Sequence, residues 1–146
     1  MKKIALATAA LALATAASGC DDGGAVFVEH LAIVNINPSH GAVGIGYATD
    51  VTVTFSEVLE AQTVSPTSIC LRMDDPADPS APCASGTVLA NVSYDAATLS
   101  ARVVPGADLL PDTRYTIYLT TAITGDASGS LPAIVTASFR TIPTAP

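Results

Sequence analysis

The clearest pattern in the chain is a strict alternation of apolar and polar side chains over residues 50–57. Val51, Val53 and Phe55 alternate there with threonine and serine. A period of two is typical of a β-strand that buries one face and leaves the other in water. The pattern therefore predicts a strand whose apolar side chains enter a hydrophobic core.

Shorter apolar and β-branched runs follow at similar intervals, and residues that favour turns separate them. They predict further strands over residues 32–37, 67–73, 87–94, 98–104, 115–121 and 134–141. Turns are expected at residues 39–41 and 44–46, and a loop near residues 125–130. About seven antiparallel strands with one apolar face each can be satisfied by two packed sheets. We therefore expect an all-β sandwich, with an eight-stranded barrel as the alternative.

A second pattern lies where a turn becomes the strand at residue 115. Leu109, Pro111, Thr113 and Tyr115 occupy alternate positions. This spacing is typical of a tyrosine corner, in which the tyrosine hydroxyl bonds to backbone a few residues upstream. An ordinary strand after a proline turn is the alternative. The corner favours the sandwich over the barrel.

The first residues have a different composition, with two lysines before an apolar run over residues 4–17. This is typical of a bacterial secretory signal and is too short for a spanning helix. Residues 17–20, Ala-Ser-Gly-Cys, resemble the lipobox of bacterial lipoproteins, although Ala17 stands where leucine is usual. The resemblance implies a cleaved lipoprotein signal peptide over residues 1–19 and a diacylated Cys20. Ordinary signal cleavage nearby is the alternative.

The predicted lipid anchor would attach the protein to a membrane without spanning it, since two or more acyl chains give stable anchoring. Residues 20–30 would then form a polar, glycine-containing tether. Residues 31–146 form the predicted domain, which is long enough for one hydrophobic core. We expect export to the cell envelope, and the sequence does not choose between an anchor in the inner and one in the outer membrane.

The charge of the chain excludes one class of partner. The full chain carries a net charge of −7. Loss of residues 1–19 removes both lysines, so four arginines remain against thirteen acidic residues, a net charge of −9. Such a surface repels phosphate backbones, and nucleic-acid binding is therefore excluded.

Five short motifs follow one another in order between residues 35 and 142. They are Pro-Ser-His-Gly at 38–41, the alternating strand at 50–57, Val-Ser-Tyr-Asp at 92–95, Pro105 with the corner up to Tyr115, and Ser-Phe-Arg-Thr at 138–141. Together they resemble the bacterial Ig-like domain of S-layer and other surface proteins. The resemblance implies an Ig-like Greek-key β-sandwich. The family's Asp-x-x-Gly-Asn loop is only partly kept, at residues 126–130, and the tryptophan and inter-sheet cysteines of antibody domains are absent.

If Cys20 is acylated, Cys70 and Cys83 remain as an even pair in an exported protein. Disulfides persist in such compartments, and the two cysteines bracket one loop between predicted strands. We therefore predict a Cys70–Cys83 disulfide. Two thiols with no nearby histidine do not make the four ligands of a zinc site, so no metal is expected there.

The same loop contains three carboxylates, Asp74, Asp75 and Asp78. A calcium site needs six to eight oxygen ligands, and the ligand order of an EF-hand loop is absent. A solvated acidic loop is the simpler interpretation. Calcium held jointly with backbone carbonyls or with Asp126 is the alternative.

No sequence signature of catalysis or of a cofactor is found. His30 and His40, the two histidines, both fall in predicted loop or tether, and we expect neither an enzyme nor a cofactor. Tyr118 alternates away from Tyr115 and is expected to be exposed. The expected function is a lipid-anchored envelope module with a structural, adhesive or protein-interaction role. A module that binds cell-wall polysaccharide, another carbohydrate or a small ligand is the alternative.

Overall fold

The computed structural model describes residues 29–145, so the predicted signal peptide, Cys20 and most of the tether lie outside the described residues. Within this range the chain forms ten strands and one short 3₁₀ helix. Their bounds are β1 Ile33–Asn37, β2 Ala42–Ile45, β3 Val51–Phe55, η1 Ala61–Thr63, β4 Ile69–Arg72, β5 Ala90–Asp95, β6 Ser100–Pro105, β7 Arg114–Leu119, β8 Thr124–Gly125, β9 Gly129–Ser130 and β10 Val135–Thr141. No helix in this part of the chain is long and apolar enough to cross a membrane.

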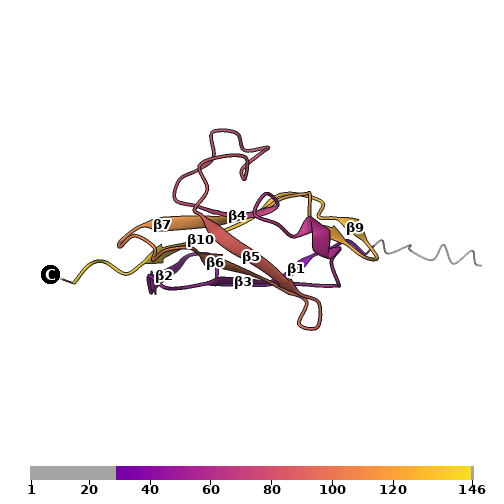
Figure 1. Ribbon diagram of the computed structural model, residues 1–146, viewed down its shortest axis with the longest axis horizontal. Coiled ribbons are helices and arrows are strands. Elements are labelled where there is room, and N and C mark those ends of the chain that lie inside the picture. Colours follow the sequence, from indigo (N-terminus) through magenta and orange to yellow (C-terminus); the bar gives the residue numbers. More distant parts are fainter. Residues whose placement is uncertain (1–28, 146) are drawn as a thin grey trace, which may run out of the picture.

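The strands form two four-stranded layers and one small hairpin (Figure 1). One sheet has the order β1-β3-β6-β5 and the other the order β2-β10-β7-β4, while β8 pairs with β9. Apart from β2, this is the division of strands between the two sheets of an Ig-like sandwich. Both sheets are open, with two edge strands each. The predicted sandwich is therefore confirmed, and the barrel is excluded.

The hydrophobic core lies between the two sheets, where the alternation of the sequence places it. Val51, Val53 and Phe55 of β3 are at most 1% exposed. They belong to one core cluster with residues of the other sheet, including Ile117, Leu119 and Phe139. Burial of side chains of this size stabilises by about 1.5–3 kcal/mol each, so this interface is the main source of stability.

Strand β2 departs from the prediction. The sequence predicts turns at residues 39–41 and 44–46 and no strand between them, but residues 42–45 form an edge strand that pairs in parallel with β10. The sandwich is therefore not wholly antiparallel. The strand has no alternating pattern, because its two outer residues are half-buried and its two central residues exposed. Its sequence, Ala-Val-Gly-Ile, carries no strand signal beyond one β-branched pair, and its pairing depends on a partner almost one hundred residues away.

The loop predicted near residues 125–130 also contains regular structure. Thr124–Gly125 and Gly129–Ser130 pair as β8 and β9, and an isolated bridge joins Leu59 to Gly125. The other predicted strands are present with shorter or shifted ends. Residues 67–73 contain β4, and residues 87–94 contain most of β5.

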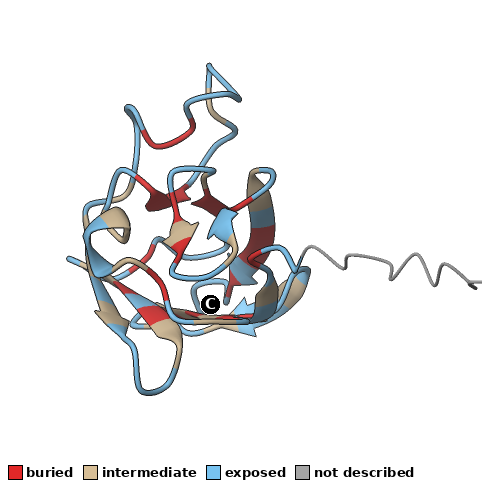
Figure 2. Cartoon of the chain, turned by 90° about the vertical axis from the view of Figure 1, so that its right-hand side faces the viewer, coloured by how far each residue is buried: buried red, intermediate tan, exposed pale blue. Residues whose placement is uncertain are grey.

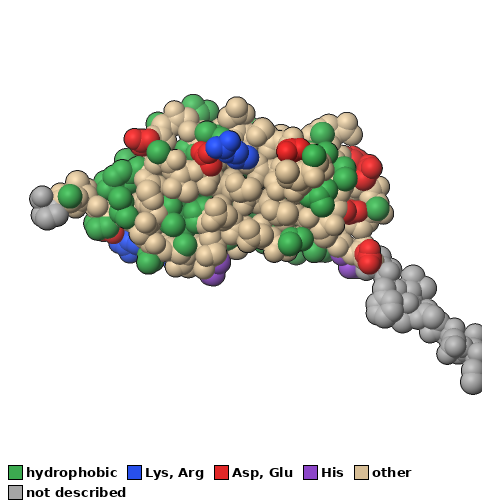
Figure 3. All heavy atoms as spheres, turned by 90° about the horizontal axis from the view of Figure 1, so that it is seen from below, with side chains coloured by type: hydrophobic (Ala, Val, Ile, Leu, Met, Phe, Trp, Pro, Cys, Tyr) green, Lys and Arg blue, Asp and Glu red, His purple; other side chains and the backbone are tan. Residues whose placement is uncertain are grey.

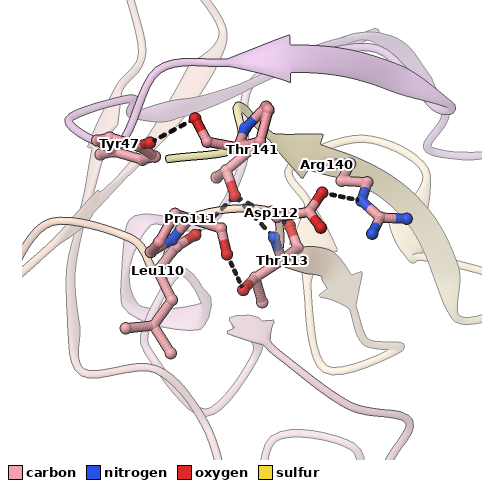
Figure 4. A network of polar contacts seen from close by, with 8 residues as sticks. Tyr47, Leu110, Pro111, Asp112, Thr113, Arg140 and Thr141 are labelled. Carbon is pink, nitrogen blue, oxygen red and sulfur yellow. Dashed lines mark hydrogen bonds and ion pairs between the residues drawn. The ribbon is translucent and has the colours of Figure 1, made fainter. Parts of the chain in front are cut away.

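The turn before β7 has the geometry of a tyrosine corner. The Tyr115 hydroxyl accepts the N–H of Leu110 at 2.8 Å, and Leu109 is buried in the core. Thr141, at the end of β10, donates its hydroxyl to the Leu110 carbonyl at 2.6 Å and accepts the N–H of Thr113 at 2.9 Å (Figure 4). The threonine that ends the Ser-Phe-Arg-Thr motif therefore joins the last strand to the corner.

Pro111 and Thr113 close the turn itself. The Thr113 hydroxyl donates to the Pro111 carbonyl at 2.7 Å. Asp112 between them adopts a positive φ of 48° and pairs with Arg140 at 2.9 Å (Figure 4). Both partners of that ion pair are more than half exposed, so the pair contributes little to stability.

Candidate functional site

The most prominent surface feature is the segment between β4 and β5, residues 73–86, here called the acidic loop. It stands out from the β2-β10-β7-β4 sheet at the top of Figure 1. The predicted disulfide between Cys70 and Cys83 is confirmed and ties the loop to β4, with the two Cα atoms 5.6 Å apart. Figure 2 shows a mostly exposed segment with one buried stretch, which contains Pro82 and Cys83.

Arg72 holds the base of this loop. Its side chain is only 9% exposed, and its guanidinium donates to the carbonyls of Asp74 at 3.2 Å, Pro82 at 3.1 Å and Ser85. Gly86 has a φ of +68°, and a Cβ at this position would lie 2.9 Å from an Arg72 nitrogen. A buried charge is tolerated only with such a set of hydrogen bonds. In the sequence, Arg72 is only one of the four arginines that enter the net charge, and no local pattern marks it as buried.

Tyr118 lies beside the disulfide, so the prediction that it is exposed is wrong. It is 7% exposed and packs with Cys70, Cys83 and Ile134. Its hydroxyl donates to an Asp75 carboxylate oxygen at 3.3 Å. Burial, and then the negative charge of Asp75, raise the pKa of the Tyr118 phenol above its ordinary value. The acidic loop covers the outer face of β7 here, and the alternation of β7 alone carried no sign of this cover.

Two of the three carboxylates of the acidic loop, those of Asp75 and Asp78, accept hydrogen bonds from different partners. Asp75 accepts the Tyr118 hydroxyl, while Asp78 accepts both the N–H at 2.9 Å and the hydroxyl at 2.6 Å of Ser80. These hydrogen bonds lower the pKa of the Asp78 carboxyl. Residues 29–145 contain no group of three or more His, Cys, Asp or Glu side chains that could hold a metal ion. Asp74, Asp75 and Asp78 therefore form no preassembled calcium site.

The Glu57 carboxylate holds the loop between β8 and β9. Glu57 accepts the backbone N–H groups of Ala127 and Ser128, each at 3.2 Å, and the Ser128 hydroxyl. Gly125 packs directly against it, since a Cβ there would lie 2.7 Å from the Glu57 carboxyl carbon. The Glu57 carboxylate and the partly kept Asp-x-x-Gly loop are thus two halves of one contact. Their separation of about seventy residues kept sequence reasoning from connecting them.

The two histidines occupy different positions. His30 is exposed near the start of the described chain. His40 is exposed before β2, and its Nδ1 accepts the backbone N–H of Ser138 at 3.2 Å, not the Ser138 hydroxyl. This geometry does not prepare Ser138 for attack on a substrate, because its hydroxyl has no base as partner.

The surface of the described residues presents no aromatic platform. The six aromatic side chains within residues 29–145 are all buried or half-buried, namely Tyr47, Phe55, Tyr94, Tyr115, Tyr118 and Phe139. Exposed apolar side chains are scattered over several elements. On the face shown in Figure 3 they are interspersed with polar groups, and acidic side chains are spread along its edge.

The fold, the corner and the Glu57 contact lie within the region that a known family matches. The family model described as bacterial Ig-like domain matches residues 28–141. This chain belongs to the bacterial Ig-like domain family. The match covers all five motifs of the sequence analysis. No curated protein matches the chain.

Several solved structures share the fold at low identity. Domains 1–6 of the surface layer protein SbsC match with a TM-score of 0.53 and 14% identity, over 81% of this chain and 14% of that one. PcoC, a methionine-rich copper resistance protein from Escherichia coli, matches with a TM-score of 0.57 and 17% identity, over 77% of this chain and 99% of that one. CopC from Methylosinus trichosporium OB3b matches with a TM-score of 0.54 and 12% identity, over 80% of this chain and 98% of that one. At such identities the likeness establishes the fold alone.

Proposed function

We propose that this bacterial Ig-like chain is an exported, lipid-anchored module of the cell envelope with a structural, adhesive or protein-interaction role. The observation that carries the proposal is the Cys70–Cys83 disulfide, because disulfides persist outside the reducing cytoplasm. The N-terminal pattern ending at Cys20 supports the anchor. The fold shared with a surface layer protein supports a place at the cell surface.

The architecture suits such a role. The core is closed between two sheets, and a covalent bond stiffens the largest projecting loop. Strands β1 and β5 are open edges of one sheet, and an edge strand can pair with an extended segment of a partner. We propose a non-catalytic function, which agrees with the contacts of His40 and Ser138.

Two other functions receive no support from specific residues. A carbohydrate-binding module usually presents exposed aromatic rings, and the aromatic side chains of residues 29–145 are covered. The copper resistance proteins share the fold, but this chain contains two methionines, Met1 and Met73. We therefore propose neither sugar nor copper binding.

Thiol trapping in intact cells tests the export part of the proposal. Cells producing the full chain are quenched with acid, and free thiols are alkylated before and after reduction. We expect Cys70 and Cys83 to react only after reduction. A variant that lacks residues 2–19 stays in the cytoplasm and should react without reduction. Equal reaction of both chains before reduction would contradict export.

Metabolic labelling with an alkyne fatty acid tests the anchor. The full chain should take up the label, and Cys20→Ser should not. Cys83→Ser is the matched control, since it also removes one thiol but leaves the predicted acylation site intact. Label on Cys20→Ser, or none on the full chain, would overturn the anchor.

A further inference from the structure

A shallow hollow of about 230 Å³ lies on the outer face of the β2-β10-β7-β4 sheet, here called the β2–β10 hollow. Its polar lining consists of His40, Arg114, Ser138 and Arg140. The hollow is open to solvent beside Gly41, where an added Cβ would meet no atom within 4 Å. It lies apart from the acidic loop, whose residues do not line it.

The register of β7 and β10 concentrates positive charge here. Arg114 pairs directly opposite Arg140 across the two strands. Like charges in directly opposed positions destabilise a sheet. Arg140 has a carboxylate partner in Asp112, through its Nε. Within residues 29–145 no carboxylate oxygen lies within 4 Å of Arg114, which instead donates to the Ser138 hydroxyl at 3.0 Å.

The other arginines of the domain are used differently. Arg72 is buried under the acidic loop, and Arg102 pairs with Asp50 on the opposite sheet. Arg114, Arg140 and Asp112 together leave one positive charge at the hollow, on a chain whose net charge is −7. A local positive site on an acidic protein attracts an anion at short range.

The hollow also presents directed hydrogen-bond donors. A guanidinium has five N–H groups, and in Arg114 one nitrogen bonds to Ser138. The Arg140 contact with Asp112 uses Nε, so the two terminal nitrogens of Arg140 are left to donate to a ligand. Because His40 accepts a hydrogen bond at Nδ1, its Nε2 is the ring nitrogen left as a further donor. The Ser138 hydroxyl is held from the side by Arg114.

We propose that the β2–β10 hollow binds an oxyanion, a carboxylate or phosphate group, through Arg114, Arg140 and His40. Donors with net positive charge are the chemistry that recognises such groups, and a guanidinium can bond two oxygens at once. The anion would offset the repulsion between the paired arginines. This site goes beyond the proposed envelope role, since it holds or fails whether or not Cys20 is acylated.

Titration of the full chain in nonionic detergent tests the site, with inorganic phosphate and acetate as separate probes at low ionic strength. Backbone amide shifts are followed by NMR, and chloride at matched ionic strength is the reference. We expect saturable shifts centred on the amides of Gly41 and Ser138, with dissociation constants of about 1 mM. Saturation by phosphate alone identifies a phosphate-bearing ligand, and saturation by acetate a carboxylate.

Arg114→Gln should weaken binding of the saturating probe at least about tenfold, because charge-assisted hydrogen bonds are lost. Arg102→Gln, which removes an exposed arginine from the other sheet, is the matched control and should bind like the unaltered chain. Arg114→Lys keeps the charge without the two-pronged donor and should give an intermediate affinity. Non-saturable shifts, or equal weakening by Arg114→Gln and Arg102→Gln, would overturn the proposal.

Discussion

At the level of single residues, several side chains join segments that are far apart in the sequence. Glu57 holds the hairpin of β8 and β9, Thr141 holds the tyrosine corner, and Arg72 holds the acidic loop. Each satisfies two or more backbone groups. Loss of such a side chain leaves partly buried donors or acceptors unpaired, which costs more than the hydrogen bond itself contributes.

The Glu57 contact gives a prediction with an internal control. Glu57→Ala should lower the free energy of unfolding by about 1–3 kcal/mol, because three donors lose their acceptor. Gly125→Ala should cost a similar amount by displacing the same carboxylate. In the double variant the two losses should not add, since both remove one contact. Urea denaturation of the four chains measures this, and full additivity would contradict it.

The corner gives a second prediction. Thr141→Val should destabilise by about 1–3 kcal/mol, because the side chain is 2% exposed and bonds to two backbone groups. Tyr115→Phe should cost about 1 kcal/mol through its single hydrogen bond. Tyr47→Phe is the control, since its hydroxyl donates to the Pro143 carbonyl at the surface and should matter little. If thermal unfolding shows that Tyr47→Phe destabilises the protein more than the other two variants, the stabilising role of the corner is contradicted.

At the level of elements, patterns within a short stretch of sequence predicted the features that depend only on that stretch. The alternation at Val51 and Phe55 predicted β3 and its buried face, and the two cysteines predicted the disulfide. Strand β2, the cover over Tyr118 and the burial of Arg72 could not be predicted in this way. Each depends on which distant segment packs against it, and a pattern within one strand does not contain that information.

The disulfide should stabilise the whole domain and the acidic loop in particular. The bond closes a loop with a sequence separation of 13, for which the chain-entropy model gives roughly 3 kcal/mol. Cys70→Ala combined with Cys83→Ala should lower the free energy of unfolding by about that amount. Limited proteolysis should then cut first within residues 73–86. Unchanged stability and unchanged cleavage would contradict this prediction and show that packing around Arg72 holds the acidic loop without the disulfide.

Tyr118 makes the strand β7 and its loop sensitive to alkaline pH. The folded-state pKa of this phenol is raised, whereas in the unfolded chain it is about 10. Above about pH 10 the unfolded chain therefore binds fewer protons than the folded chain, and the free energy of unfolding falls as pH rises. Below that pH the contribution of Tyr118 is fully present.

Tyr118→Phe should reduce this loss. Its free energy of unfolding, followed by urea denaturation from about pH 8 to about pH 11, should fall less steeply than that of the unaltered chain. The variant removes only the hydroxyl and keeps the packing on the disulfide. Parallel curves for the two proteins would show that Tyr118 does not couple folding to pH.

For the molecule as a whole, three features support one account. The domain is a bacterial Ig-like sandwich and contains a disulfide, and the pattern of residues 1–20 predicts a lipoprotein leader. We propose that this sandwich, with its acidic composition and the β2–β10 hollow, binds components of the cell envelope. The structural neighbours agree in fold only, so the role itself depends on experiments with this chain.

Intact mass of the protein purified from native membranes, with and without reduction, tests this account most directly. We predict a chain that starts at Cys20, carries acyl chains and gains two hydrogen atoms on reduction of the Cys70–Cys83 bond. An unacylated chain with free thiols would contradict both the anchor and the exported state. The bacterial Ig-like domain would then need a function outside the cell envelope.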